Sequence, residues 1–317
     1  MAAVSEFELI RRYLSAIGTS PHLVLGVGDD CAIIAPPADR QLVVTTDTLV
    51  AGVHFPPDCD AGALARRALR VNLSDLAAMG ADVLGIQLAL TLPAADTSWI
   101  AAFSAGLAAD CEVFACPLMG GDTTRGPLAV TITAMGTVPT GQALLRSGAQ
   151  VGDQLYVTGS LGDARAALEV MDASGAGGGA LASRYWLPQP RLLAGTLLRG
   201  LASAALDISD GLVQDAGHIA RASGIGCQIE IAALPLSEAL TGTFERDQAI
   251  TWALTGGDDY ELCFAVPARH VAAAERALRA ADQSFTRVGE MVAGQGVRCV
   301  DTEGQLVALA KEGYVHF

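Results

Sequence analysis

The stretch Leu-Val-Val-Thr-Thr-Asp at residues 42–47 carries the pattern that decides the fold class. Its apolar and β-branched residues predict a strand that delivers Asp47 at its end. The next long segment, residues 62–79, has helical spacing, and Asn72 and Asp75 share one face of it because they are three positions apart. We therefore expect strands that lead into polar turns and helices, with carboxylates at the junctions.

Strands and helices alternate in this way through both halves of the 317-residue chain. The pattern predicts further strands at 83–91, 128–138, 153–158, 228–231 and 262–266, and helices at 98–110, 190–201, 211–222 and 268–281. Glycine and proline residues in 139–152 indicate a boundary. The sequence thus predicts two domains, 1–140 and 141–317, with an α/β or α+β fold.

The charge balance excludes several functions. The net charge is −14, which disfavours binding to nucleic acid or to an anionic membrane. Lys311 is the only lysine, so the chain has neither a P-loop lysine nor the strand lysine of protein kinases. Any bound phosphate must be held by arginine, backbone N–H groups or metal.

Cysteine usage and hydropathy predict a cytoplasmic protein. The seven cysteines form no Cys-x-x-Cys pair, and we interpret them as buried, reduced thiols. Acidic residues near the N-terminus, Glu6 and Glu8, argue against a signal peptide. The uncharged run 126–145 contains two prolines and three glycines, which predicts strands and turns instead of a membrane span.

Six short motifs pair aspartate with glycine, threonine or serine, at 28–30, 45–47, 72–75, 120–124, 207–211 and 256–259. Each motif alone is typical of an ordinary helix cap or turn. Carboxylates that converge in one pocket raise each other's pKa unless a cation lies between them. Magnesium prefers oxygen ligands and often holds phosphates as well, so the set predicts an enzyme that binds phosphates through several Mg²⁺ ions.

Seven segments, in this order, resemble the thiamine-monophosphate kinases, in the wider superfamily of aminoimidazole-ribonucleotide synthetase and selenophosphate synthetase. They are Gly-Val-Gly-Asp-Asp-Cys-Ala (26–32), Thr-Thr-Asp-Thr-Leu-Val (45–50) with His54-Phe55, Val-Asn-Leu-Ser-Asp-Leu-Ala-Ala-Met-Gly (71–80), Gly-Gly-Asp-Thr-Thr-Arg-Gly (120–126), Arg-Ser-Gly (146–148), Asp-Ile-Ser-Asp-Gly-Leu (207–212) and Gly-Gly-Asp-Asp-Tyr-Glu-Leu (256–262). The resemblance covers essentially the whole chain.

This resemblance implies a two-domain fold and an activity. The N-terminal domain would have a mixed sheet that pairs with its copy in a homodimer and would bind ATP and magnesium. The C-terminal α/β domain would complete the nucleotide and substrate site. The implied reaction is direct transfer of the γ-phosphoryl group of ATP to thiamine monophosphate, giving thiamine diphosphate in the last step of its biosynthesis.

The resemblance also assigns roles to individual residues. The implied magnesium ligands are Asp30, Thr45, Thr46, Asp47, Asp75, Asp122, Asp207 and Asp210. The implied contacts to ATP are Gly121, Asp122, Arg146 and Ser209. The implied contacts to thiamine monophosphate are His54, Asp258 and Tyr314. Members of the family often have glutamate where this chain has Asp258, and the shorter side chain reaches about one bond less.

No residue is assigned as a general base. The acceptor is a phosphate monoester whose second pKa is about 6, so it is already a dianion near neutral pH. His54 is either a substrate contact or a structural turn residue, and we interpret His218 as structural. Asp215 is interpreted as a supporting or surface acid instead of a metal ligand. Arg146 is either a surface arginine or a phosphate partner.

Two alternatives stay open on the sequence. One is another enzyme of the superfamily, a selenophosphate or aminoimidazole-ribonucleotide synthetase. The former would normally have a reactive cysteine and a lysine near its N-terminus, and neither is placed that way here. The other alternative is a non-catalytic metal- or nucleotide-binding protein, which the full set of ligand-type residues disfavours.

Overall fold

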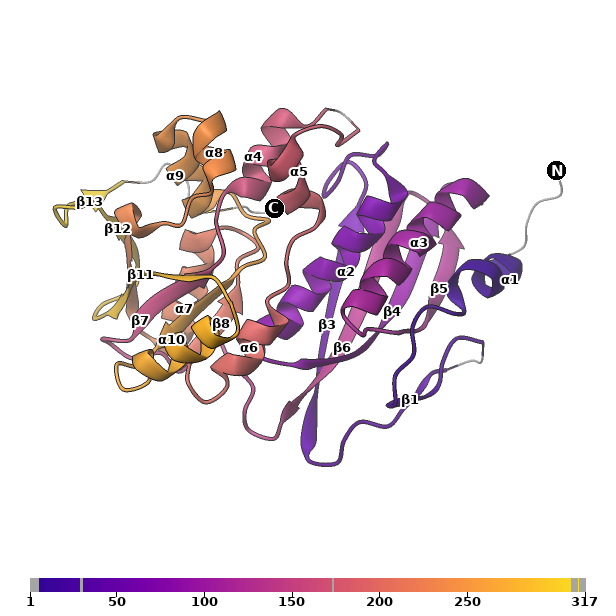
Figure 1. Cartoon of the computed structure of the whole chain (residues 1–317), viewed down its shortest axis with the longest axis horizontal. Helices are drawn as coiled ribbons and strands as arrows, with labels where there is room; N and C mark the ends of the chain where they lie inside the picture. Colours follow the sequence, from indigo (N-terminus) through magenta and orange to yellow (C-terminus); the bar gives the residue numbers. More distant parts are fainter. Residues whose placement is uncertain (1–5, 29–30, 173, 309–312, 314–317) are drawn as a thin grey trace. The chain divides into compact units, whose positions relative to one another are not determined.

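The computed structural model describes residues 6–28, 31–172, 174–308 and 313. The chain divides into two compact units (Figure 1). The first contains Met1–Leu76, Asp82–Gly141 and Met171–Gly177, and the second contains Ala77–Ala81, Gln142–Val170 and Gly178–Phe317.

The first unit is built on a four-stranded sheet of order β3–β6–β4–β5. Its strands are β3 (Arg40–Val50), β4 (Asp82–Leu92), β5 (Leu118–Arg125) and β6 (Ala129–Pro139). β6 pairs antiparallel with both β3 and β4, whereas β4 and β5 are parallel. A short antiparallel pair, β1 (Leu23–Leu25) and β2 (Ile33–Ile34), and the helical turns α1 (Glu6–Leu9) and η1 (Ile10–Leu14) precede this sheet.

Two helices cover one face of this sheet, α2 (Ala61–Ala78) and α3 (Thr97–Val113) (Figure 1). Alternate residues of β6, namely Val130, Ile132 and Ala134, are fully buried beneath them, as the two-residue period of a half-covered strand requires. The opposite face is open, and on β3 it exposes 52% of Leu42 and 52% of Val44.

Two sequence predictions in this unit are wrong about the local structure. β3 continues past Asp47, because residues 48–50 keep the strand pattern and pair with β6 as far as Ala129. The predicted turn at 120–122 lies inside β5. Gly121 permits this close pairing, since a Cβ there would lie 1.8 Å from the carbonyl oxygen of Leu88 on β4.

The second unit contains a seven-stranded sheet of order β13–β12–β9–β11–β7–β10–β8. Its strands are β7 (Gln154–Thr158), β8 (Ala204–Asp207), β9 (Gly226–Glu230), β10 (Leu262–Val266), β11 (Phe285–Val292), β12 (Gly296–Val300) and β13 (Leu306–Val307). β10 pairs antiparallel with both β7 and β8.

Helices pack on both faces of this sheet. The helices of this unit are α4 (Asp163–Val170), α5 (Gly179–Trp186), α6 (Leu192–Leu198), α7 (Leu212–Ser223), α8 (Glu238–Thr243), α9 (Arg246–Thr255) and α10 (Val271–Ala280), with the 3₁₀ turn η2 (Ile231–Ala233). Of these, α6, α7, α9 and α10 contribute to the cores beside the sheet, whereas α4, α5 and α8 contact one another. Cys263 and Ala265 of β10 pack in one core with α7, and Phe264 packs in a second core with α6 and α10. The mixed α/β character predicted from the sequence is confirmed.

The prediction that the cysteines are buried agrees only in part with the structure. All seven cysteines are free and six are buried, but Cys31 is exposed because it lies in the loop just before the short strand β2. Among the described residues, no helix combines the length and apolar character needed to cross a bilayer.

Candidate active site

In the first unit, three predicted ligands meet between β3 and α2. Thr45 Oγ1 donates a hydrogen bond to Asp75 Oδ2 at 2.5 Å. The backbone N–H of Asp47 donates to Asn72 Oδ1 at 3.0 Å, and this bond fixes the strand against the helix. Thr45 and Asp47 both face α2 because they are two residues apart on one strand.

The electrostatics of this group favour a cation. Burial, followed by the negative charge of Asp75, raises the pKa of Asp47 to about 6. Two ionised carboxylates close together are costly unless a positive charge lies between them. The donors are all oxygen, which is the donor set that Mg²⁺ prefers. Thr45, Asp47 and Asp75 therefore fit a magnesium ion.

Thr46 lies on the opposite, open face of the same sheet. Its hydroxyl is hydrogen bonded to that of Thr133 on β6 at 2.9 Å, and Thr48 makes the same contact with Thr131. Asp122 belongs to this face as well. It lines a hollow of about 620 Å³ together with Gly28, Gly121, Thr131 and Thr133.

The predicted ligands of the first unit therefore divide between the two faces of its sheet. They also divide between the two edges, because β6 and β4 lie between β3 and β5. Three strand spacings amount to about 14 Å, which is too far for Asp47 and Asp122 of one chain to share a metal ion. Asp30 lies outside the described residues.

His54 follows the end of β3 and is held by it. Its Nδ1 accepts the backbone N–H of Val50 at 3.0 Å. A nitrogen that accepts in this way carries no proton, so in the neutral ring the proton is on Nε2. The bond fixes the orientation of the ring, which suits either of the two roles expected for His54.

In the second unit, the loop between β8 and α7 is organised around one buried carboxylate. Asp215 Oδ2 accepts the backbone N–H groups of Ser209, Asp210 and Gly211 at 3.0, 3.0 and 3.1 Å. Burial raises the pKa of Asp215 to about 7, although these N–H groups act in the opposite direction. Asp207, at the end of β8, is only 7% exposed.

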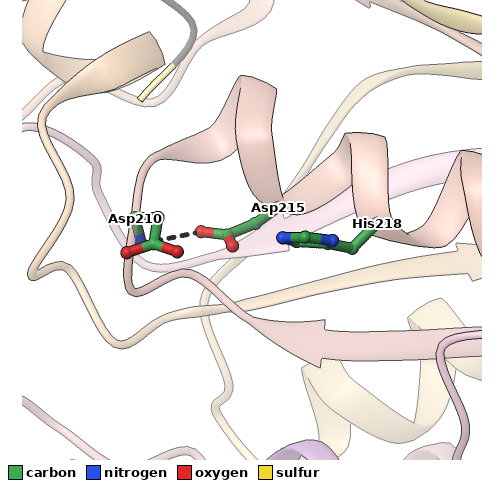
Figure 2. A group of neighbouring side chains, drawn as sticks. All are labelled: Asp210, Asp215 and His218. Carbon is green, nitrogen blue, oxygen red and sulfur yellow. Dashed lines mark hydrogen bonds between the residues drawn. The ribbon is translucent and has the colours of Figure 1, made fainter. Parts of the chain in front are cut away.

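Asp210, Asp215 and His218 bring their ligand atoms within 4.8 Å of one another. Figure 2 shows the Asp215 carboxylate between the other two side chains, at the start of α7. Asp210 Oδ2 also accepts a hydrogen bond from Gln214 Nε2 at 2.8 Å. Asp210 is the predicted magnesium ligand of this group.

Positively charged side chains also lie near Asp210 and His218. Burial lowers the pKa of His218, and the guanidinium groups of Arg146 and Arg221 lower it further. Arg146 is exposed in the segment beside β8, where the carbonyl of Leu145 accepts the N–H of Ala205. The structure therefore brings Arg146 close to the loop that carries Ser209 and Asp210.

A second loop packs on the first through backbone bonds. The N–H of Asp258 donates to the carbonyl of Ser209, and the N–H of Tyr260 donates to that of Ile208, both at 2.8 Å. Asp258 and Tyr260 have φ of 63° and 50°, a conformation that costs energy for residues other than glycine and that concentrates at functional sites. Gly257 makes the approach possible, because a Cβ there would lie 2.6 Å from the Ser209 carbonyl oxygen.

The charged residues beneath this second loop were not predicted from the sequence. Glu261 is fully buried and accepts hydrogen bonds from Thr158 Oγ1, Arg184 Nη2 and Arg191 Nε. Asp259 is also buried, and burial raises its pKa well above the ordinary value. The sequence signal that could have revealed them is the presence of three acidic residues within 258–261, more than an ordinary turn contains.

The end of the chain approaches the first loop at Gly313. A Cβ on this residue would lie 2.5 Å from Gln214 Oε1 and 2.9 Å from the carbonyl oxygen of Asp210. Gly313 therefore lies against the residues that surround Asp210. The predicted substrate contact Tyr314 lies outside the described residues.

Comparison with known proteins places both units in one class. Residues 28–138 match the family model of the AIR synthase related protein N-terminal domain, and residues 150–302 match that of the C-terminal domain. The two units therefore define an AIR synthase related protein.

Relatives that align over nearly the whole chain show which family within this class the chain resembles. The chain is 47% identical over 321 residues to the thiamine-monophosphate kinase of Escherichia coli (strain K12), covering 99% of each chain. A crystal structure of the thiamine-monophosphate kinase from Stenotrophomonas maltophilia K279a is 44% identical with a TM-score of 0.85, covering 90% of this chain and 93% of that one. The structure of AaThiL complexed with AMPPCP and TMP is 30% identical with a TM-score of 0.77, covering 92% of each chain.

The chain belongs to the thiamine-monophosphate kinase family. The resemblance seen in the sequence motifs is confirmed. The synthetase and non-catalytic alternatives are not favoured, because the similarity to the kinases extends over the full length of the chain.

Proposed function

We propose that this protein transfers the γ-phosphoryl group of ATP to thiamine monophosphate and produces thiamine diphosphate, as the last step of thiamine diphosphate biosynthesis. The full-length similarity to a kinase with this name supports the proposal, as does the complex of a similar chain with AMPPCP and TMP. The observation of this structure that carries it is the oxygen-donor group of Thr45, Asp47 and Asp75.

Phosphoryl transfer depends on positioning and charge neutralisation more than on covalent chemistry. The acceptor phosphate is a dianion near neutral pH, so the protein needs no general base. When bound at Thr45, Asp47 and Asp75, magnesium would neutralise charge on the phosphates. Asp30, Thr46, Asp122, Asp207 and Asp210 are proposed as the further ligands.

The remaining residues bind and orient the two substrates. Ser209 and Gly121 are proposed to contact ATP, and Arg146 supplies a positive charge for its phosphates. His54, whose ring is fixed by β3, is proposed to contact thiamine monophosphate together with Asp258 and Tyr314. The first unit would thus bind ATP and magnesium, and the second would complete the nucleotide and substrate contacts.

We further propose that the protein acts as a homodimer in the cytoplasm. Supporting the dimer, the open face of the first unit's sheet exposes Leu42 and Val44. Asp47 and Asp122 lie on strands at opposite edges of this sheet. If β3 of one copy adjoins β5 of a second copy, the strand that carries Thr46 and Asp47 lies beside the strand that carries Asp122 of the second copy, so that both chains contribute ligands to each site.

A product assay tests the proposed reaction. The purified protein with magnesium, ATP and thiamine monophosphate should produce ADP and thiamine diphosphate in equal amounts, separated and quantified by chromatography. Asp122→Ala should abolish turnover without unfolding the protein. Turnover of a different phosphorylated acceptor, with no thiamine diphosphate formed, would contradict the proposal.

A further inference from the structure

We propose that Asp215 is a positioning residue that holds both loops of the second unit, 208–211 and 257–260, in the conformation that binds the substrates. The proposal rests on the proposed function for the roles of Ser209, Asp210 and Asp258. It assigns to Asp215 no contact with substrate, metal or reacting atoms. Asp215 acts through the backbone of the first loop, and through that loop on the second.

Three backbone N–H groups surround the Asp215 carboxylate in the arrangement that binds anions in other proteins. We call these three N–H groups the cradle. Three consecutive N–H groups at a helix N-terminus ordinarily form a binding site for phosphate or another anion. Here all three, from Ser209, Asp210 and Gly211, converge on one oxygen of Asp215. Gly211 permits this turn, since its φ of 122° disfavours a side chain.

Asp215 therefore occupies the three N–H groups of the cradle, and they do not bind the phosphates of ATP. The N–H of Ser209 is bonded to Asp215, and its carbonyl accepts the N–H of Asp258. Within the described part of the chain, the hydroxyl is the group of Ser209 for which no hydrogen bond is recorded. The contact of Ser209 with ATP is thus assigned to its hydroxyl.

The two loops are coupled because the second is hydrogen bonded to the first. The carbonyls of Ile208 and Ser209 accept the N–H groups of Tyr260 and Asp258. The strained positive φ at both donor residues persists only while neighbouring structure holds it. Release of the first loop therefore removes the backbone bonds that hold Asp258 and Tyr260 and leaves this loop anchored through Asp259, whose carboxylate accepts the N–H of Gly162. Asp215 thus influences residues assigned to both substrates.

The chain offers a matched control for this carboxylate. Asp153 is 4% exposed, as Asp215 is, and it accepts the N–H of Gln150 at 2.9 Å and the Ser203 hydroxyl at 2.6 Å. It lies before β7, at the opposite end of the sheet from Asp207: Gln154 pairs with Val266, whereas Asp207 pairs with Leu262. Asp153→Asn therefore removes a buried, hydrogen-bonded charge far from the two loops.

The experiment compares Asp215→Asn with Asp153→Asn in the full chain. Hydrogen bonds to a charged group are worth more than neutral ones. At pH 8, above the pKa of Asp215, Asp215→Asn should therefore raise KM for both ATP and thiamine monophosphate by about tenfold. Hydrogen exchange of the 208–211 and 257–260 amides should accelerate by a similar factor. Asp153→Asn should change neither. Unchanged KM values in Asp215→Asn, or equal effects of the two substitutions, would overturn the proposal.

A measurement on the unmodified protein covers the case in which Asp215→Asn does not fold. The amides of Ser209, Asp210 and Gly211 should exchange at least about a hundredfold more slowly than free-peptide amides, although none of them lies inside a helix or strand. Rapid exchange there would refute the cradle. This result is independent of activity, so a failure of the proposed function, seen as a wild-type protein without kinase turnover, is distinguished from a failure of this inference.

Discussion

Asp47 is a proposed magnesium ligand with a raised pKa. Its pKa is raised from 3.8 to about 6 by burial and by the charge of Asp75. The folded protein therefore binds a proton at Asp47 more tightly than the unfolded chain does. Between these two values the stability of the metal-free protein falls as the pH rises, and it is greatest below about pH 4 as far as Asp47 is concerned.

Asp47→Asn should therefore stabilise the metal-free protein at pH 7 while preventing turnover. The gain should be about 1–2 kcal/mol after allowance for solvent screening, because the amide needs no compensating charge. The free energy of unfolding from urea titrations at pH 4 and pH 7, with and without magnesium, measures the effect. At pH 4 the two proteins should differ little, and magnesium should stabilise the wild type only.

If Asp47→Asn were less stable than the wild type at pH 7 without magnesium, the Asp47 carboxylate would be stabilising in the absence of metal. Equal stabilisation of both proteins by magnesium would show that Asp47 is not a ligand.

At the residue scale the sequence predicted side chains that the structure brings together, and it left Asp215 open as either a supporting or a surface acid. Thr45, Asp47 and Asp75 converge because their spacing places two on one strand face and one on the helix that covers it. Asp215 was not predicted to organise a loop. Its role depends on three backbone N–H groups that point at one oxygen, and residue types do not encode that convergence.

At the scale of secondary-structure elements, the two loops of the second unit differ in what holds them. The loop before α7 is fixed by a side chain, Asp215, whereas the 257–260 loop is held by backbone bonds to the first loop and by the Asp259 carboxylate, which accepts the N–H of Gly162. The backbone of Asp258 is held by the bond from its own N–H to the Ser209 carbonyl. This permits the charge of Asp258 to be tested alone.

Asp258→Asn should raise KM for thiamine monophosphate about fivefold, which corresponds to about 1 kcal/mol, and should leave KM for ATP unchanged. Asparagine tolerates a φ of 63° as well as aspartate does, so the loop is retained and the negative charge that would face the cationic thiazolium is lost. Steady-state kinetics with each substrate varied in turn measure the effect.

Asp282→Asn is the matched control, because Asp282 also has a positive φ, of 54°, in the exposed turn after α10. It should behave as the wild type. An equal rise in both KM values for Asp258→Asn would indicate loop disruption instead of a lost contact.

The helices and strands were largely predictable from the sequence, but the residues at which they begin and end were not. The helix predicted at 62–79 is α2 at Ala61–Ala78, because a long amphipathic period is a strong signal. The predicted end of β3 at Asp47 and the predicted turn at 120–122 failed for a different reason. Glycine and aspartate disfavour a strand interior locally, but pairing with β6 and β4 extends the ladder through them.

At the scale of the whole molecule, the division of predicted ligands between two edges of one sheet requires an explanation. A site completed by two copies of the chain accounts for it. Mixing two inactive variants tests this arrangement, because a symmetric dimer then contains sites with different combinations of mutations.

Asp47→Asn and Asp122→Asn should each be inactive alone, and refolding them together should restore about a quarter of the wild-type activity. Half of the dimers formed at random are mixed, and each mixed dimer carries one intact site of two. Turnover before and after co-refolding measures the recovery. Asp47→Asn mixed with Asp75→Asn is the control, which should stay inactive because both residues come from the same chain. No recovery in the first mixture would place each complete site within one chain.

The fold class and the family followed from the order of the motifs along the chain, which is a property of sequence alone. The pairing of strands far apart in sequence, such as β3 with β6, was not predicted. Such pairing depends on non-local contacts that local periodicity does not report. The assignment of ligands to faces and edges depends on that pairing.

The fate of the γ-phosphoryl group tests the central claim most directly. ATP labelled at the γ-phosphorus should pass its label to the terminal phosphate of thiamine diphosphate, with a dependence on magnesium and on thiamine monophosphate and without labelled protein. Label released mainly as inorganic phosphate, or label retained on the protein, would contradict direct transfer between the two phosphates.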